Sequence, residues 1–75
     1  MGMILPLEED VEDIIALGEA IRSARKASGI TQADLADLAG IAVRTVRAIE
    51  SGAGNPSLAA VVGAANAVGL KIRAI

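Results

Sequence analysis

Two arginines three positions apart, Arg44 and Arg47, are the side chains of this sequence best suited to bind another molecule. On a helix, residues three apart lie on the same face. A guanidinium group can form two parallel hydrogen bonds with the edge of guanine or with a phosphate. The spacing therefore predicts a nucleic-acid contact, with two solvated surface arginines as the alternative.

The chain offers little that could perform catalysis. Its 75 residues include no cysteine, no histidine and no aromatic residue. This composition excludes thiolate metal sites, disulfides and a histidine general base. The acidic cluster at residues 8–13 lies in no evident pocket, and the apolar run 58–70 is too short to span a membrane. We therefore expect no enzyme, cofactor, metal or small-molecule substrate, in a protein of the reducing cytoplasm.

The net charge of −2 is unevenly distributed along the chain. Five of the nine acidic residues lie at positions 8–13, so residues 14–75 carry seven basic and four acidic side chains, a balance of +3. This balance permits binding to nucleic acid without requiring it. Residues 1–10 combine the acidic run with a proline and no periodicity, and we interpret them as a flexible acidic leader.

Apolar residues at helical intervals predict a first helix that begins near Val11 or Ile14 and ends at Gly29. Basic residues occupy its last turns, where positive charge favours the end of a helix. The apolar stripe consists of Ile14, Leu17, Ile21 and Ala24.

A second helix is predicted over residues 32–39, after the good N-cap Thr31. Asp34 stands where a capping box has glutamate or glutamine. Because aspartate is shorter, we expect only its charge to stabilise the helix. Its expected core residues are Leu35 and Leu38.

A third helix is predicted from about Ala42 or Val43 to Ser51. Ala42 stands where serine or threonine would normally cap, and the missing cap costs about 1 kcal/mol. Val46 and Ile49 are expected to face the core.

The residue types around the second and third helices are those that a steep helix crossing requires. Ala36 is small enough for two backbones to approach, Gly40 tolerates a positive φ, and Val46 is a branched apolar plug. Their fixed spacing favours a helix-turn-helix over a plain antiparallel hairpin.

A fourth helix, residues 58–68 after the cap Ser57, is apolar nearly all the way round. A monomer buries only one side of such a helix, so we expect a second copy to cover the rest. Residues 70–75 predict a strand, which as the only strand must pair with that of another chain. The expected dimer interface comprises Val61, Ala65, Val68, Leu70 and Ile72.

A set of these residues has the spacing of a known family. Its members are Thr31, Gln32, Leu35, Ala36, Gly40, Ile41, Val46 and Ile49–Gly52. With them the chain resembles the Cro/repressor (Xre) helix-turn-helix family from about Leu17 to Leu70. The resemblance implies an all-α, lambda-repressor-like DNA-binding domain of four or five helices, here at residues 11–69. The strand at residues 70–75 further resembles HipB-type antitoxins, in which the terminal strands of two monomers pair to form a lid.

The resemblance and the residue chemistry together assign roles to individual side chains. The resemblance implies that Gln32 binds a DNA phosphate and that Arg25 pairs with Glu50; two separate exposed charges are the alternative to the pair. Arg44 and Arg47 are expected to contact bases or phosphates. The other expected DNA contacts are Ala42 through its backbone, Val43 at a thymine methyl, Thr45 at a phosphate if it is more than a surface residue, and Asn55 at a phosphate.

These expectations predict a transcriptional repressor that binds a palindromic operator sequence-specifically as a homodimer. The HipB resemblance adds a kinase-like toxin, for which the protein would be the antitoxin. Two alternatives remain. One is an orphan regulator of the same family without a toxin, and the other is a protein-interaction module that has lost DNA binding.

Overall fold

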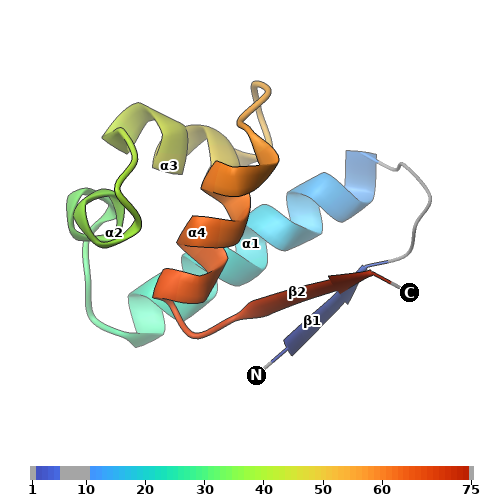
Figure 1. Ribbon diagram of the computed structural model, residues 1–75, viewed down its shortest axis with the longest axis horizontal. Coiled ribbons are helices and arrows are strands. Elements are labelled where there is room, and N and C mark those ends of the chain that lie inside the picture. Colours follow the sequence, from blue (N-terminus) through green and yellow to red (C-terminus); the bar gives the residue numbers. More distant parts are fainter. Residues whose placement is uncertain (1, 6–10, 75) are drawn as a thin grey trace.

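The computed structural model describes residues 2–5 and 11–74. Four helices pack around one small core, and two short strands lie beside them (Figure 1). In chain order the elements are β1 (Gly2–Leu5), α1 (Val11–Ala27), α2 (Gln32–Ala39), α3 (Val43–Ser51), α4 (Leu58–Ala67) and β2 (Lys71–Ala74). No helix in this part of the chain is both long enough and apolar enough to cross a lipid bilayer.

Helices α2 and α3 form the predicted helix-turn-helix. Figure 1 shows α2 almost end-on and α3 from the side, so the two helices cross steeply and do not form an antiparallel hairpin. Gly40 ends α2 with a φ of 69°, a conformation that side chains with a Cβ rarely adopt. Ala36 and Val46 are both buried in the core, as their predicted roles at the crossing require.

The core joins all four helices. Ile21 of α1, Leu35 of α2 and Val46 of α3 are its largest fully buried side chains. Ala64 and Ala65 complete the core from α4, whose small residues let that helix lie close to the others. Because the chain has no aromatic residue, aliphatic side chains alone fill this core.

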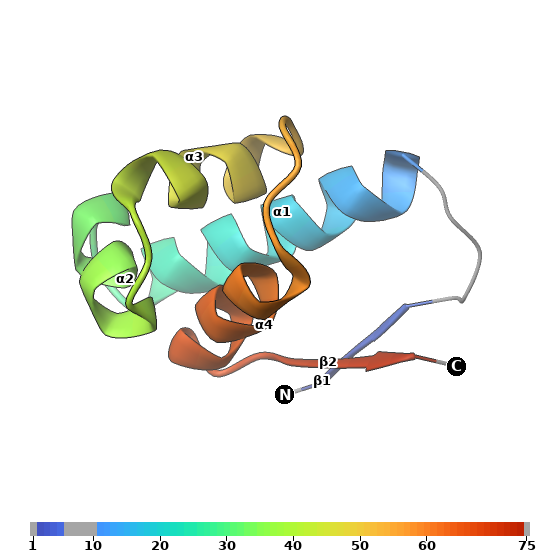
Figure 2. The ribbon, with the colours of Figure 1, turned by 45° about the horizontal axis from the view of Figure 1, so that its top comes forward.

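Gly18 allows α1 and α3 to touch backbone to backbone. A Cβ added at Gly18 would overlap the carbonyl oxygen of Ile49 and lie 3.2 Å from that of Glu50. Figure 2 shows α3 lying beside α1 at this level. No pattern in the sequence indicates this contact, because Gly18 lies within a helical apolar stripe without breaking it.

One expected core residue lies at the surface. Leu38 is 65% exposed, so its assignment to the core was wrong; Ile14, the first residue of the apolar stripe, is 57% exposed. The buried face of α2 is centred on Leu35 and Ala36, and Leu38 lies at its outer edge because successive helical residues are rotated by about 100°. Ile14 lies in the first turns of α1 and lines a small apolar hollow with Ala48 and Val61, which leave much of its side chain uncovered.

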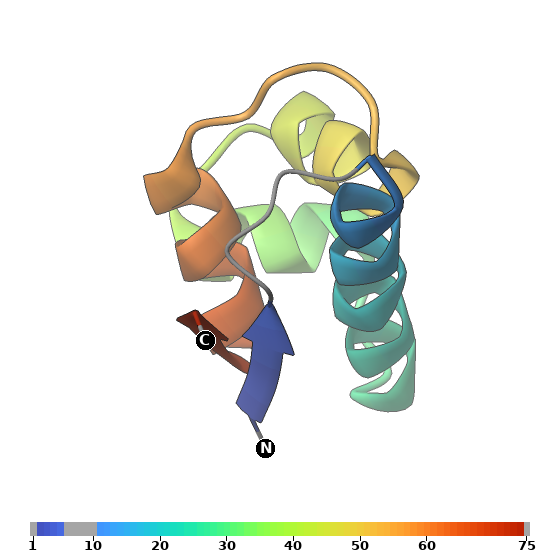
Figure 3. The same cartoon turned by 90° about the vertical axis from the view of Figure 1, so that its right-hand side faces the viewer.

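The terminal strands pair with each other within the chain. β1 runs parallel to β2, with Gly2 opposite Lys71 and Leu5 opposite Ala74 (Figure 3). Two predictions are therefore corrected: residues 2–5 are a strand and not part of a flexible leader, and the C-terminal strand finds its partner in its own chain. An unpaired strand leaves its backbone groups unsatisfied, and the apolar segment near the N-terminus supplies the missing partner. Residues 6–10 of the expected leader lie outside the described residues.

Helix caps explain where α2 and α4 begin. Thr31 Oγ1 accepts a hydrogen bond from the Asp34 amide at 3.0 Å, and Asp34 Oδ2 accepts one from the Thr31 amide at 2.9 Å. This is a complete capping box, so the expectation that Asp34 acts through its charge alone was wrong. Ser57 caps α4 by accepting from the Ala60 amide, whereas Ala42 provides no side-chain cap for α3, as predicted.

Candidate nucleic-acid interface

The N-terminal half of α3 presents the predicted recognition residues at the surface. Ala42, Arg44 and Arg47 are exposed, while Val43 and Thr45 are half-buried. Val43 packs against the core with part of its side chain and leaves the rest accessible. The two arginines are three residues apart on one helix face, so both side chains can enter the same groove of a duplex.

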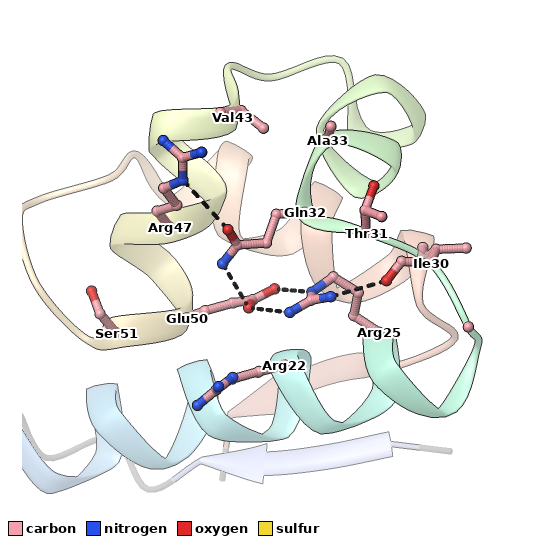
Figure 4. A pocket seen from close by; sticks show the side chains of 11 residues that line it. Arg22, Arg25, Ile30, Thr31, Gln32, Ala33, Val43, Arg47, Glu50 and Ser51 are labelled. Carbon is pink, nitrogen blue, oxygen red and sulfur yellow. Dashed lines mark hydrogen bonds and ion pairs between the residues drawn. The ribbon is translucent and has the colours of Figure 1, made fainter.

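An ion pair between Arg25 and Glu50 lies directly behind this surface. Arg25 Nε is 2.7 Å from Glu50 Oε2, and Arg25 Nη2 is 3.0 Å from Glu50 Oε1 (Figure 4). The side chains are only 10% and 3% exposed. Arg25 Nη1 also donates to the carbonyl oxygen of Ile30 at 2.9 Å. The pair implied by the family resemblance is therefore present, and it ties α1 to the last turn of α3.

Both members of the pair are charged. Burial by itself would raise the pKa of the Glu50 carboxyl, but hydrogen bonds from Arg25 and Gln32, with the charges of Arg25 and Arg22, outweigh it and lower the pKa. The hydrogen bond to Glu50 is the main cause that raises the pKa of Arg25. Behind the exposed surface of α3, the positive charge of Arg25 and the negative charge of Glu50 therefore cancel.

Gln32 connects the buried ion pair to the exposed arginine. Its Nε2 donates to Glu50 Oε1 at 3.2 Å, and its Oε1 accepts from Arg47 Nε at 3.4 Å (Figure 4). The sequence predicted each of these residues separately but not their connection, because they are 15 and 18 positions apart and only the helix crossing brings them together.

An open cleft of about 710 Å³ lies between α1, the start of α2 and α3. Three of its lining side chains are arginines, one from α3 and two from α1, and we call it the arginine cleft. It is lined by Arg22, Arg25, Gly29, Ile30, Thr31, Gln32, Ala33, Val43, Arg47, Glu50 and Ser51. The predicted phosphate-binding Gln32 thus lies in a positively charged hollow.

The remaining predicted site residues lie away from the cleft. Asn55 is exposed in the loop between α3 and α4. Ala65, expected in the dimer interface, is fully buried within the monomer, so that prediction was wrong. Ala65 belongs to the core cluster, so a second copy cannot reach it. The other expected interface residues, Val61, Val68, Leu70 and Ile72, are half-buried against the core.

A steeply crossed helix pair, with two exposed arginines on the second helix and an ion pair behind it, defines a helix-turn-helix DNA-binding protein. The family model described as helix-turn-helix, HTH_3, matches residues 21–75, and the chain belongs to this family. The family and the fold make the protein a DNA-binding transcriptional regulator of the Xre type.

One solved relative is similar over most of its length. The chain is 32% identical to the restriction-modification controller protein C.AhdI from Aeromonas hydrophila, with a TM-score of 0.70. The match covers 80% of this chain and 91% of that one. No curated protein sequence matches the chain.

Proposed function

We propose that this protein acts in the cytoplasm as a homodimeric repressor that recognises a palindromic operator. The observation that carries the proposal is the exposed pair Arg44 and Arg47 on the N-terminal half of α3. In helix-turn-helix proteins this part of the second helix enters the major groove and contacts base edges. The similarity to a controller protein favours a regulator of transcription.

The proposed contacts differ in what they read. Arg44 and Arg47 bind guanine edges, and the accessible part of Val43 contacts a thymine methyl. Ala42 contacts the DNA backbone through its main-chain atoms. Phosphates are bound by Gln32, Thr45 and Asn55, which position the protein without selecting a sequence.

The homodimer is proposed from the apolar surface that the monomer leaves uncovered. Leu58, at the start of α4, is 75% exposed, and it is followed by the half-buried Val61 on the same helix and the half-buried Val68 directly after its end. Apolar side chains that cluster at the surface favour a site that another protein covers. A two-fold dimer would place two α3 helices about 34 Å apart, one turn of duplex DNA.

An antitoxin role has less support than a repressor role without a toxin. The similarity to HipB-type antitoxins depended on a terminal strand shared between two copies, whereas β2 pairs with β1 of its own chain. The similar solved structure is that of a restriction-modification controller protein, which favours a regulator over an antitoxin. A kinase-like toxin that purifies with the protein would restore the antitoxin hypothesis.

Selection of bound duplexes from a random pool tests the proposal, with the mass of the complex measured in the same buffer. We expect a palindrome with half-sites one helical turn apart and two protein chains on each duplex. Enrichment of no sequence would leave the protein-interaction module as the better hypothesis. A selected site without two-fold symmetry, bound by one chain, would contradict the dimer.

A further inference from the structure

One arginine beside the recognition helix is explained neither by the fold nor by the DNA contacts proposed above. Arg22 is exposed on α1, one turn before Arg25, and lines the arginine cleft. Among the described residues, Arg22 has no hydrogen bond or ion pair, and Glu19, one turn earlier, does not pair with it. A long exposed cation that lines a cleft, and makes no hydrogen bond with another described residue, is available for an anion from outside.

The arginine cleft has an excess of positive charge. Its charged lining residues are three arginines and one carboxylate, a balance of +2. Arg25 is committed to Glu50 and to the Ile30 carbonyl. The excess therefore belongs to Arg22 and Arg47.

Arg22 and Arg47, whose charges no carboxylate of the cleft neutralises, lie on either side of the buried Arg25–Glu50 pair (Figure 4). Figure 4 shows the guanidinium of Arg22 on one side of the Arg25–Glu50 pair and that of Arg47 on the other. The charge of Arg22 is close enough to contribute to the lowered pKa of Glu50. Arg22 therefore extends the positive surface from the recognition helix along α1.

We propose that Arg22 binds a phosphate of the DNA backbone, beside the phosphate expected at Gln32. The inference rests on the proposed function, because it requires a duplex docked on α3. The planar guanidinium matches a phosphate with two parallel hydrogen bonds. Such a contact strengthens binding to every sequence and releases a condensed counterion.

Three substitutions test this role. Arg22→Gln removes the charge, and Arg22→Lys keeps the charge without the planar fork. Lys71→Gln is the matched control, since Lys71 is an exposed cation on β2 and does not line the cleft. Each full-length variant is titrated with the selected operator and with a scrambled duplex at several salt concentrations, after thermal melting shows that it is folded.

For Arg22→Gln we expect roughly tenfold weaker binding to both duplexes near 0.1 M salt. A dimer loses two phosphate contacts, so the plot of log K against log salt should become less steep, with the magnitude of its slope smaller by about 1.8. Arg22→Lys should keep most of the wild-type slope. Lys71→Gln should leave the slope unchanged, which separates a local contact from an effect of net charge.

Two results would overturn the assignment while the proposed function stands. One is an Arg22→Gln protein that matches Lys71→Gln in affinity and slope. The other is saturable binding of inorganic phosphate that Arg22→Gln abolishes without any change in DNA binding, which would assign the cleft to a free anion. A wild-type protein that binds no duplex would overturn the proposed function together with this inference.

Discussion

Glu50 receives two hydrogen bonds from Arg25, at 2.7 and 3.0 Å, although the two residues are 25 positions apart. The contact joins the first helix of the domain to the last turn of the helix that presents Arg44 and Arg47. The orientation of the proposed recognition helix therefore depends on a buried ion pair as well as on the apolar core.

Removing one member of this pair should destabilise the protein strongly. Arg25→Ala leaves the Glu50 carboxylate buried without its partner, and we expect a loss of about 3–5 kcal/mol in the free energy of unfolding. Urea unfolding measures it. Arg44→Ala is the control, because an exposed arginine should contribute less than about 0.5 kcal/mol. Equal stabilities of the two variants would show that the pair is weakly coupled to folding.

The same pair predicts a loss of stability in acid. The pKa of Glu50 is lower in the folded protein than its ordinary value. Its stabilising effect is therefore complete above the unfolded pKa, near 4.3, and decreases as the pH falls through the folded pKa. In unfolding titrations below about pH 4.3, wild type should lose stability more steeply than Glu50→Gln. Asp34, whose pKa is also lowered, titrates in both proteins and cancels in the comparison.

Replacing each of two helical glycines by alanine should change the stability of the protein in opposite directions. Gly18→Ala forces a methyl group into the Ile49 carbonyl, and we expect a loss of about 1–3 kcal/mol as α1 and α3 move apart. Gly63→Ala meets nothing closer than the Ala39 carbonyl oxygen at 3.8 Å, so it should raise stability by up to about 1 kcal/mol. Thermal or urea unfolding of both variants compares them. A neutral Gly18→Ala would contradict the backbone contact.

Gln32 should affect DNA binding partly through Arg47. Its amide oxygen accepts a hydrogen bond from Arg47 Nε, whereas among the described residues Arg44 makes no hydrogen bond with it. A double-mutant cycle on operator affinity should give a coupling of at least about 0.5 kcal/mol for Gln32→Ala with Arg47→Ala. The control cycle with Arg44→Ala should be additive. Arg44→Ala alone should cost about 1–3 kcal/mol and relax one base pair in each half-site. Additive energies in both cycles would mean that the Gln32–Arg47 bond is unimportant on DNA.

Stability should depend on protein concentration if a second copy covers α4. Hundredfold dilution should lower the melting temperature of the wild-type protein, because dissociation removes the stabilising interface. Leu58→Lys places a charge in the proposed interface, and its melting temperature should not change on dilution. A wild-type melting temperature that is the same at both concentrations would contradict the dimer.

Much of the helix-turn-helix could be predicted because its requirements are local. A cap at Thr31, a glycine with positive φ at position 40 and a small residue at position 36 each satisfy a constraint of nearby backbone. The Arg25–Glu50 pair was expected only from the family resemblance, since no spacing in the sequence connects the two residues. Its further connection through Gln32 to Arg47 was not expected at all.

The errors have a common origin in how the elements are arranged. Leu35 and Leu38 are both apolar residues of one short helix, and only the packing of α2 against the other helices shows that Leu35 is buried and Leu38 is exposed. The strand at the C-terminus was correct, but its partner was not, because strand pairing depends on which backbone edge lies nearby in space.

By itself the sequence determined four helices, the turn between the second and third, and the two arginines that face outward from the third. These follow from periodicity, capping and glycine conformation, which act over a few residues of chain. Only the tertiary structure decided which leucines are buried, which strand pairs with which, and that Arg22, Gln32 and Arg47 line one cleft. Such contacts join residues from different helices, and their energy depends on distances that no local pattern encodes.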